Sequence, residues 1–266
     1  MKERLDVLLV QQGFFETRER AKRAIMAGVV IVNDKKIEKA GTAIKWTDEF
    51  PDIRIKGEVL KYVSRGGLKL EKAIKIWNLD FSGKKILDVG ASTGGFTDCA
   101  LQNGAAFAYS MDVGTNQLDW KLRKHEQVRS IEGTHIKDLT LEEIDNSEID
   151  FIVMDVSFIS ITKVIPHLIK FMNEDTKLMA LIKPQFEVGR ENIEKGGIVK
   201  NPKKHKMAID MVVESAAKYG VKLHQLDFSP ITGGKGNIEY ISLFSLAETK
   251  NTVDIDEVVE ESKTLR

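Results

Sequence analysis

Four charged residues adjoin apolar stretches of the chain, and these are the residues best suited to chemistry. Asp155 and Lys183 each directly follow an apolar run, and Glu239 directly precedes one. Because a charge removed from water is costly unless it is paired, we expect these side chains to pair with one another, with Lys69 as the fourth member. A neutral lysine acts as a base, and a charged one stabilises an oxyanion. The cluster therefore predicts chemistry that moves a proton.

A glycine-rich turn, Gly90–Phe96, follows the apolar segment Lys85–Val89 and leads into a helical pattern. Glycine allows a backbone to approach a ligand closely and to adopt positive φ. Open α/β sheets bind ligands at the carboxyl ends of their strands, which is where this turn stands. Taken alone, the turn fits a dinucleotide site or a tight turn without a ligand.

Further residues favour S-adenosylmethionine as the ligand of this turn. The turn lacks the Gly-Lys-Ser/Thr ending of a phosphate-binding loop, and Asp88 ends the first strand, where it suits a cationic ligand. Asp112 ends the next strand and can accept hydrogen bonds from ribose hydroxyls. Asp138 either reaches the adenine edge or caps a helix at 139–144. The candidate cofactor contacts are Asp88, Gly90, Ser92, Thr93, Gly94, Gly95, Phe96, Asp112 and Asp138, with Phe96 better suited to anchoring the helix than to stacking on a ligand.

Alternating strands and helices must position these residues. We expect strands at 85–89, 107–111, 128–131, 151–154, 177–182, 221–226 and 240–244, and helices at 95–103, 160–171 and 203–219. Such alternation predicts a mostly parallel sheet covered on both faces, which is a Rossmann-like α/β domain.

Residues 1–60 have a different pattern. An apolar helical stripe ends near Gly13, Thr17 can cap a second helix that ends at Gly28, and a strand at 29–32 precedes a turn. This predicts a small α+β unit. Between residues 17 and 39, seven basic residues outnumber three acidic ones, an arrangement that suits phosphate contacts or is a solvated helix face. The candidate RNA contacts are Arg4, Arg18, Arg20, Lys22, Arg23, Lys35, Lys36 and Arg65.

Composition narrows the class of protein. A chain of 266 residues suits one large domain and one small one, and a net charge of zero restricts any nucleic-acid site to local patches. One cysteine excludes a disulfide framework within the chain, and the five histidines lack metal-ligand spacing, so we expect no metal. The polar start and the lack of an apolar run of roughly 18 residues predict a cytoplasmic protein that does not span a membrane. Nothing in the sequence addresses the oligomeric state.

Two resemblances sharpen these expectations. Residues Leu5–Leu9, Thr17–Ile25 and Gly28–Asn33 resemble the small RNA-binding domain named after ribosomal protein S-four. The chain as a whole resembles the TlyA family, which joins that domain to a methyltransferase domain of FtsJ type. The resemblance to that family lies in Tyr62–Leu70, Asp88–Asp98, Asp112–Arg123, Asp155–Ser160, Leu181–Glu187 and Gly236–Tyr240.

The resemblance implies a division of the chain and an activity. The expected parts are an RNA-binding domain at 1–60, a linker at 61–67, a class I S-adenosylmethionine-dependent methyltransferase domain at 68–247, and an acidic tail at 248–266 that is a final helix or a disordered end. The implied activity is 2′-O-methylation of cytidine in rRNA of the small or large subunit, with rRNA or ribosomal subunits as partners. The implied catalytic set is Lys69, Asp155, Lys183 and Glu239.

Within that set we expect Lys183 to face the ribose hydroxyl, Asp155 and Glu239 to orient it, and Lys69 to position the ribose or a phosphate. Three other functions are alternatives. They are a methyltransferase for a protein or small molecule, a membrane-lytic protein (family members are often called hemolysins), and a non-catalytic RNA chaperone, which would need neither the glycine-rich turn nor the charged cluster.

Overall fold

The computed structural model describes residues 2–15, 17–47, 50–56, 61–250 and 252–265, and it divides into two compact units. One unit spans Met1–Lys61 and the other spans Tyr62–Arg266. The expected domain end at residue 60 lies outside the described residues. Tyr62 is buried in the core of the larger unit.

The small unit wraps two helices and short strands around one apolar core. Thr17 caps α2 by accepting a hydrogen bond from the backbone N–H of Arg20 at 3.3 Å. The core lies between the helices and the strands and includes Leu5, Leu9 and Ile25. The elements are β1 (Lys2–Arg4), α1 (Leu5–Gln11), α2 (Arg18–Met26), β2 (Val30–Val32), β3 (Lys35–Lys36), β4 (Ala43–Lys45) and β5 (Ile53–Ile55). Strands β3, β2 and β5 form one sheet, and β1 pairs with β4.

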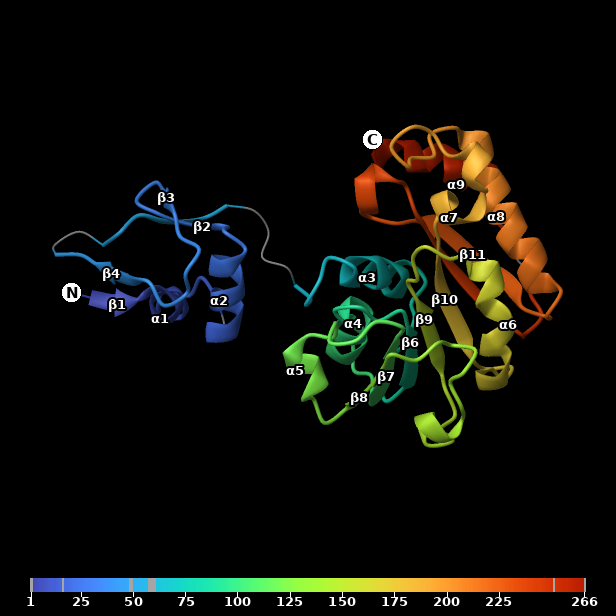
Figure 1. The fold of residues 1–266 in the computed structure, drawn as a ribbon, viewed down its shortest axis with the longest axis horizontal. Coiled ribbons are helices and arrows are strands. Elements are labelled where there is room, and N and C mark those ends of the chain that lie inside the picture. Colours follow the sequence, from blue (N-terminus) through green and yellow to red (C-terminus); the bar gives the residue numbers. More distant parts are fainter. Residues whose placement is uncertain (1, 16, 48–49, 57–60, 251, 266) are drawn as a thin grey trace. The chain divides into compact units, whose positions relative to one another are not determined.

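The larger unit is built on a seven-stranded sheet in the order β11-β12-β10-β9-β6-β7-β8 (Figure 1). The strands are β6 (Lys85–Val89), β7 (Phe107–Asp112), β8 (Val128–Glu132), β9 (Phe151–Met154), β10 (Lys177–Ile182), β11 (Lys222–Phe228) and β12 (Tyr240–Ser245). Neighbours from β10 to β8 pair in parallel, whereas β12 runs antiparallel to both β10 and β11. The mostly parallel sheet expected from the sequence is confirmed.

Helices cover both faces of this sheet, so its strands are buried on both sides. Alternate residues of one strand enter different cores: Phe151 and Val153 pack with helices α3 and α4, whereas Ile152 and Met154 pack with α6 and α8. The helices are α3 (Gly67–Ile76), α4 (Gly95–Gln102), α5 (Trp120–Arg123), α6 (Ile165–Leu168), α7 (Pro184–Glu187), α8 (Pro202–Ala217) and α9 (Ile255–Glu261).

Two expected helical segments differ from the structure. Residues 161–171 form a 3₁₀ turn, the short helix α6 and another 3₁₀ turn, rather than one helix. Pro166 is the second residue of α6, and proline lacks the N–H that would bond to the preceding turn of a longer helix. At 139–144 only Glu142–Ile144 is helical, in 3₁₀ form, and Thr140 and Glu143 cap one another there. Of the two roles left open for Asp138, the cap of a helix at 139–144 is therefore not found.

The segment after β12 is helical over α9, which Asp254 caps and which packs through Val259 against the core containing α8. Of the two possibilities left open for the tail, the helix is the one found; residues 251 and 266 lie outside the described part. Among the described residues no helix is long and apolar enough to cross a membrane.

Candidate active site

Two lysines and two carboxylates from distant parts of the sequence form one chain of ion pairs. Asp155 lies between the lysines, with Oδ1 2.5 Å from Lys183 Nζ and Oδ2 3.1 Å from Lys69 Nζ. Lys69 Nζ also lies 2.7 Å from Oε2 of Glu239. The structure thus brings together all four residues of the expected catalytic set. It differs in one respect, because Glu239 pairs with Lys69 rather than orienting Lys183.

The cluster is buried, and pairing within it fixes the charge of two members. The side chains of Lys69, Lys183 and Glu239 are 9%, 7% and 3% exposed. Burial lowers the pKa of Lys69, but Asp155 and Glu239 outweigh it and leave that pKa raised. Burial likewise acts to raise the pKa of Asp155, and the two lysines hold it below its usual value. Lys69 therefore stays an ammonium, and Asp155 stays a carboxylate, near neutral pH.

The sheet and one helix explain the convergence. Asp155 and Lys183 follow the parallel strands β9 and β10, and Glu239 precedes the antiparallel strand β12. An antiparallel strand begins at the edge where its parallel neighbours end, so all three residues reach the same edge. Ile182 pairs with Tyr240, which places Lys183 and Glu239 one step beyond the last pair of the β10–β12 ladder.

Lys69 comes from α3, and Lys72 one turn later fastens that helix to the end of β11. Lys72 Nζ donates to Asp227 Oδ1 at 2.9 Å and to the backbone carbonyl of Phe228 at 2.7 Å. It also lies 3.9 Å from the centroid of the Phe228 ring. These contacts fix the helix that carries Lys69 against the sheet.

The glycine-rich turn lies at the same edge, after β6. Gly90 has φ 83°, and a Cβ there would lie 2.9 Å from the backbone carbonyl oxygen of Asp155, so the turn passes the charged cluster at a distance that only glycine allows. Asp88 is fully buried. Its Oδ2 accepts hydrogen bonds from the backbone N–H of Thr97 at 3.0 Å and from the Thr97 hydroxyl at 2.7 Å.

The other oxygen of Asp88, Oδ1, is buried without a hydrogen-bond partner among the described residues. Burial raises the pKa of this carboxyl to about 7, although the Thr97 hydrogen bonds oppose the shift. A buried carboxylate oxygen without a partner is unfavourable unless a ligand completes it. The free oxygen of Asp88 is therefore suited to bind a hydrogen-bond donor or a positive charge of a ligand.

A cavity of about 480 Å³ is lined by the charged cluster, Asp88, residues of the glycine-rich turn and Phe96. Ser92, Thr93 and Gly95 also line it, as does Arg65, an expected RNA contact. Phe96 is only 3% exposed and packs in the core between α3, α4 and the sheet, in agreement with an anchoring role.

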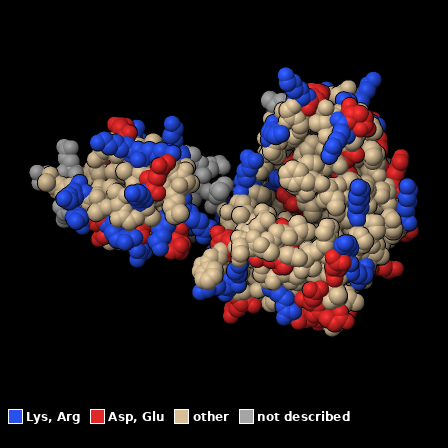
Figure 2. Space-filling view, viewed as in Figure 1, with Lys and Arg blue, Asp and Glu red and all other residues tan. Residues whose placement is uncertain are grey.

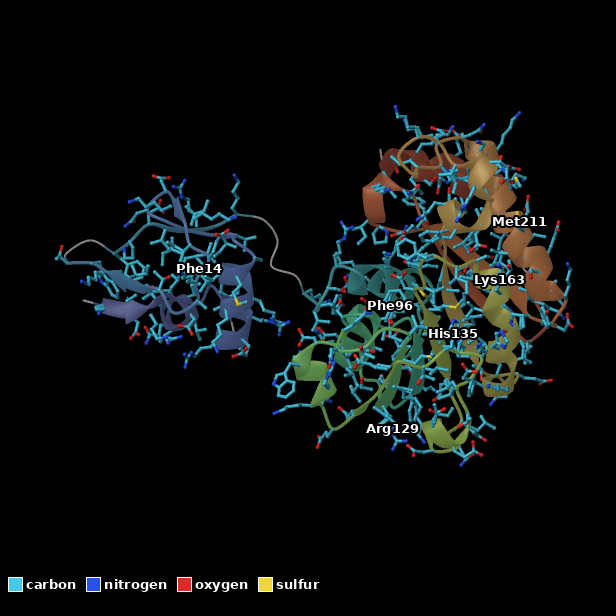
Figure 3. The ribbon with its side chains drawn as sticks, viewed as in Figure 1. Phe14, Phe96, Arg129, His135, Lys163 and Met211 are labelled. Atoms are coloured by element: carbon cyan, nitrogen blue, oxygen red, sulfur yellow. The ribbon has the colours of Figure 1, made fainter. Side chains whose placement is uncertain are left out.

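A second cavity, of about 610 Å³, shares Gly90 and Ser92 with the lining of the first and is also lined by Asp112. Asp112 accepts hydrogen bonds from the backbone N–H groups of Ser92 and Gly114, both at 2.8 Å. His135 lines this cavity, and Figure 3 labels both His135 and Phe96, which lines the first cavity.

Asp138 is exposed and is not part of either lining, so the structure does not bring it to the candidate cofactor site. Gly94 does not line either cavity and instead begins the turn into α4 with φ 93°.

The structure adds three residues that sequence reasoning missed. Ser157 accepts a hydrogen bond from Lys183 Nζ at 2.8 Å. Phe158 is 92% exposed with φ 63°, lines both cavities, and has its ring centroid 5.3 Å from that of Phe186. Gln185 lines the first cavity next to Phe186. The sequence signals that could have found them were their proximity to Asp155 and Lys183 and their place in two segments that carry the family resemblance.

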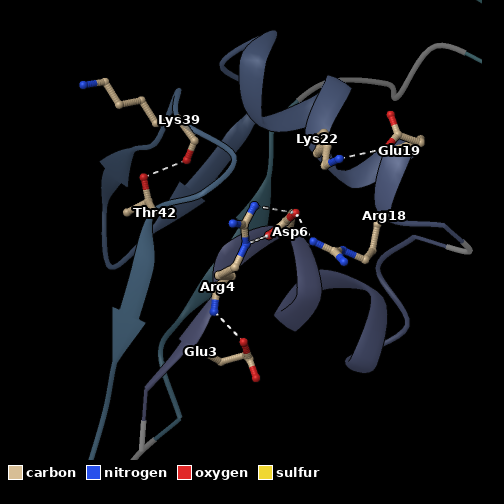
Figure 4. Close-up of polar contacts among 8 residues, drawn as sticks. All are labelled: Glu3, Arg4, Asp6, Arg18, Glu19, Lys22, Lys39 and Thr42. Carbon is tan, nitrogen blue, oxygen red and sulfur yellow. Dashed lines mark hydrogen bonds and ion pairs between the residues drawn. The ribbon is translucent and has the colours of Figure 1, made fainter.

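In the small unit, two expected RNA contacts share one buried carboxylate. Asp6 is fully buried, and its oxygens lie 2.9 Å from Arg4 Nε and 3.0 Å from a terminal nitrogen of Arg18 (Figure 4). The Arg4 hydrogen bond, aided by Arg18 against the effect of burial, lowers the pKa of Asp6 to about 2. Both arginine side chains remain half exposed, at 51% and 52%, so Asp6 holds two guanidinium groups at the surface.

The other expected RNA contacts of this unit lie on α2 and on β3. Lys22 pairs with Glu19, and Lys36 pairs with Glu38. Arg20 and Arg23 are half-buried, and Lys35 is exposed. Figure 2 shows basic side chains over much of the visible face of this unit.

Comparison with known proteins agrees with this architecture. Residues 62–246 match the family described as FtsJ-like methyltransferase, and residues 3–49 match the S4 domain. A solved structure described as a candidate hemolysin from Streptococcus thermophilus is 44% identical, with a TM-score of 0.76, and the match covers 99% of this chain and 96% of that one.

Two curated relatives match over most of their length. Hemolysin A of Brachyspira hyodysenteriae is 42% identical over 91% of this chain and 99% of its own. The 16S/23S rRNA (cytidine-2′-O)-methyltransferase TlyA of Mycobacterium tuberculosis is 36% identical over 89% of this chain and 87% of its own. The fold and the site define a methyltransferase of FtsJ type. The chain belongs to the TlyA family, in which that domain is joined to an S4 domain.

Proposed function

We propose that this protein transfers a methyl group from S-adenosylmethionine to the 2′-hydroxyl of a cytidine ribose in rRNA. The observation that carries the proposal is the buried cluster of Lys69, Asp155, Lys183 and Glu239, which lines a cavity that shares Gly90 and Asp155 with a second cavity lined by Asp112. The name of the Mycobacterium tuberculosis relative supports the choice of cytidine and of rRNA.

The residues present fit S-adenosylmethionine. The unpartnered oxygen of Asp88 offers a buried site for a positive charge or an N–H donor, and Gly90 allows close approach of a ligand to the backbone. Asp112 stands in the second cavity, where its carboxylate suits ribose hydroxyls. When bound, the cofactor supplies a methyl group on a sulfonium, which needs no activation by the protein.

The protein must therefore act on the nucleophile, because a ribose hydroxyl is too weak an acid to ionise near neutral pH. Lys183 stands beside the hydroxyl in our proposal, and Asp155 and Ser157 hold its ammonium or amine group in place. Lys69 keeps its charge because of Asp155 and Glu239, so it serves as a fixed cation for the ribose or a phosphate. Holding two reactants in line can supply roughly 7–11 kcal/mol of the barrier, more than proton transfer alone.

The rest of the chain delivers the RNA. Arg4 and Arg18, held by Asp6, and the basic residues of α2 suit backbone phosphates, whose neutralisation releases counterions. Arg65 lines the first cavity and suits a phosphate next to the target ribose. Phe158 exposes an aromatic face beside the charged cluster, which suits stacking of an unpaired base. In this proposal residues 1–60 bind RNA, residues 68–247 catalyse the transfer, and the protein works in the cytoplasm, where ribosomes are.

The test is methyl transfer from radiolabelled cofactor to rRNA, to ribosomal subunits and to total cell protein. We expect label in rRNA or subunits, at a ribose position that mapping shows unmethylated in cells lacking the gene. Label in protein alone would overturn the proposal. Leakage of phospholipid vesicles exposed to the same preparation tests the activity that the name hemolysin implies, and we expect none.

A further inference from the structure

Gln185 carries a buried amide oxygen that nothing in the described part of the chain satisfies. It is the second residue of α7, two positions after Lys183, and it lines the cavity that holds the charged cluster. Its Oε1 is excluded from solvent and has no hydrogen-bond partner among the described residues. Native proteins satisfy nearly all buried polar groups, so such an atom calls for a partner from outside the chain.

The surroundings of Gln185 offer aromatic and apolar surface to a flat group with polar edges. The rings of Phe158 and Phe186 lie close together with an interplanar angle of 50°, and Ile193 adds an apolar side chain to the same cavity. Aromatic faces bind the face of a base, and an amide binds its edge. Lys183 precedes Gln185 by two residues and lines the same cavity, so a nucleotide held here has its ribose near the charged cluster.

We propose that Gln185 determines base specificity by accepting a hydrogen bond from the exocyclic amine of the target base. An amide oxygen can only accept. Cytosine presents an amine donor at its 4-position, where uracil presents a carbonyl acceptor that would face the amide oxygen unfavourably. Gln185 therefore favours cytidine over uridine. This inference rests on the proposed function, since it concerns the base attached to the ribose that is methylated.

Two variants separate the oxygen of the amide from its nitrogen, because rotation of the side chain could present the NH₂ group to uracil instead. Gln185→Glu keeps an acceptor and removes the donor, so it should retain the preference for cytidine. Gln185→Met keeps a similar length and removes both groups. Gln225→Met makes the same change on β11, outside the cavity, and serves as the matched control.

The experiment compares single-turnover methylation of rRNA transcripts that carry cytidine or uridine at the mapped position, using the full chain. We expect the cytidine-to-uridine rate ratio of wild type to fall by about 5- to 150-fold in Gln185→Met, and to persist in Gln185→Glu and Gln225→Met. An unchanged ratio in Gln185→Met overturns the inference, as does loss of the preference in a folded Gln185→Glu variant.

Failure of the proposed function has a different signature, because wild type would then methylate neither transcript. A wild-type enzyme that methylates cytidine, combined with a ratio that does not depend on Gln185, leaves the proposed function intact and removes only the role of this residue.

Discussion

Lys69 Nζ and Glu239 Oε2 lie 2.7 Å apart, although 170 residues separate them in sequence and both side chains are almost fully shielded from water. Their pairing joins the first helix of the larger unit to the start of its last strand. The pair is thus a link in the fold as well as part of the site, and its energetics can be measured without substrate.

A double-mutant cycle should show strong coupling between these two residues. Lys69→Met leaves Glu239 buried without its partner, and we expect it to reduce the free energy of unfolding by about 3 kcal/mol. Glu239→Met should cost less, because Lys69 keeps Asp155 as a partner. The double variant should lose less than the sum of the two, because it leaves neither of these charges stranded. Urea unfolding measures all three. Additive losses would show that the ion pair contributes no coupling.

Lys183→Ala should abolish methyl transfer without impairing cofactor binding. We expect the single-turnover rate to fall about 10²–10⁴-fold, as for loss of a proton-transfer group, because the group beside the hydroxyl is gone while Asp88 and Asp112 are untouched. Lys177→Ala, an exposed lysine at the other end of the same strand, is the control. Full single-turnover activity in Lys183→Ala would exclude the role assigned to it.

Cofactor affinity should depend on pH through Asp88. Its pKa in the free protein is raised to about 7, so below that pH a cationic ligand must displace a proton before it meets a carboxylate. We expect affinity to fall by up to about tenfold per pH unit below 7 and to level off above it. Calorimetry with S-adenosylmethionine at several pH values, without RNA, measures this dependence. Asp88→Asn should flatten the profile, and a steep profile in that variant would assign the titration to another group.

The small unit should lose stability in acid through Asp6. Its pKa is lowered to about 2, so its contribution is complete above pH 4 and is lost as the pH falls through 2. Allowing for solvent screening by the half-exposed arginines, we expect Asp6→Asn to cost about 1–2 kcal/mol at pH 7. Hydrogen exchange of the α1 and α2 amides reports on this unit separately. Glu19→Gln, an exposed acid of the same unit, should change protection little.

Substitution of two glycines that both have positive φ, Gly83 and Gly90, distinguishes the cost of backbone strain from that of steric contact. Gly83 has φ 71° and open space around the position of a Cβ, so Gly83→Ala should cost about 1–2 kcal/mol from conformation alone. Gly90→Ala adds a Cβ 2.9 Å from the Asp155 carbonyl oxygen, so it should cost about 1–3 kcal/mol more and weaken cofactor binding. Thermal unfolding and calorimetry check both effects. Equal effects of the two substitutions would mean that the close approach at Gly90 is unimportant.

Sequence patterns predicted the parts of this site that strand ends determine. Buried parallel strands are continuous apolar runs with sharp ends, so the positions of Asp155 and Lys183 at one edge of the sheet followed from the pattern alone. The partner of Glu239 did not, because it depends on where Lys72 holds α3 against β11. Phe158 and Gln185 were missed because residue spacing does not show that a phenylalanine ring is exposed or that an amide oxygen lacks a hydrogen-bond partner.

The reversed direction of β12 has a consequence for changes in chain length. Side chains of a strand alternate between faces, so a one-residue slip between β10 and β12 would turn Glu239 away from Lys69 and carry every apolar residue of the strand to the opposite core. The register of β10 and β12 thus determines where the Glu239 carboxylate lies. Insertions between Ser229 and Asn237 leave this register unchanged. A single deletion within Tyr240–Ser245 would instead displace the Glu239 carboxylate and the apolar side chains of β12 together.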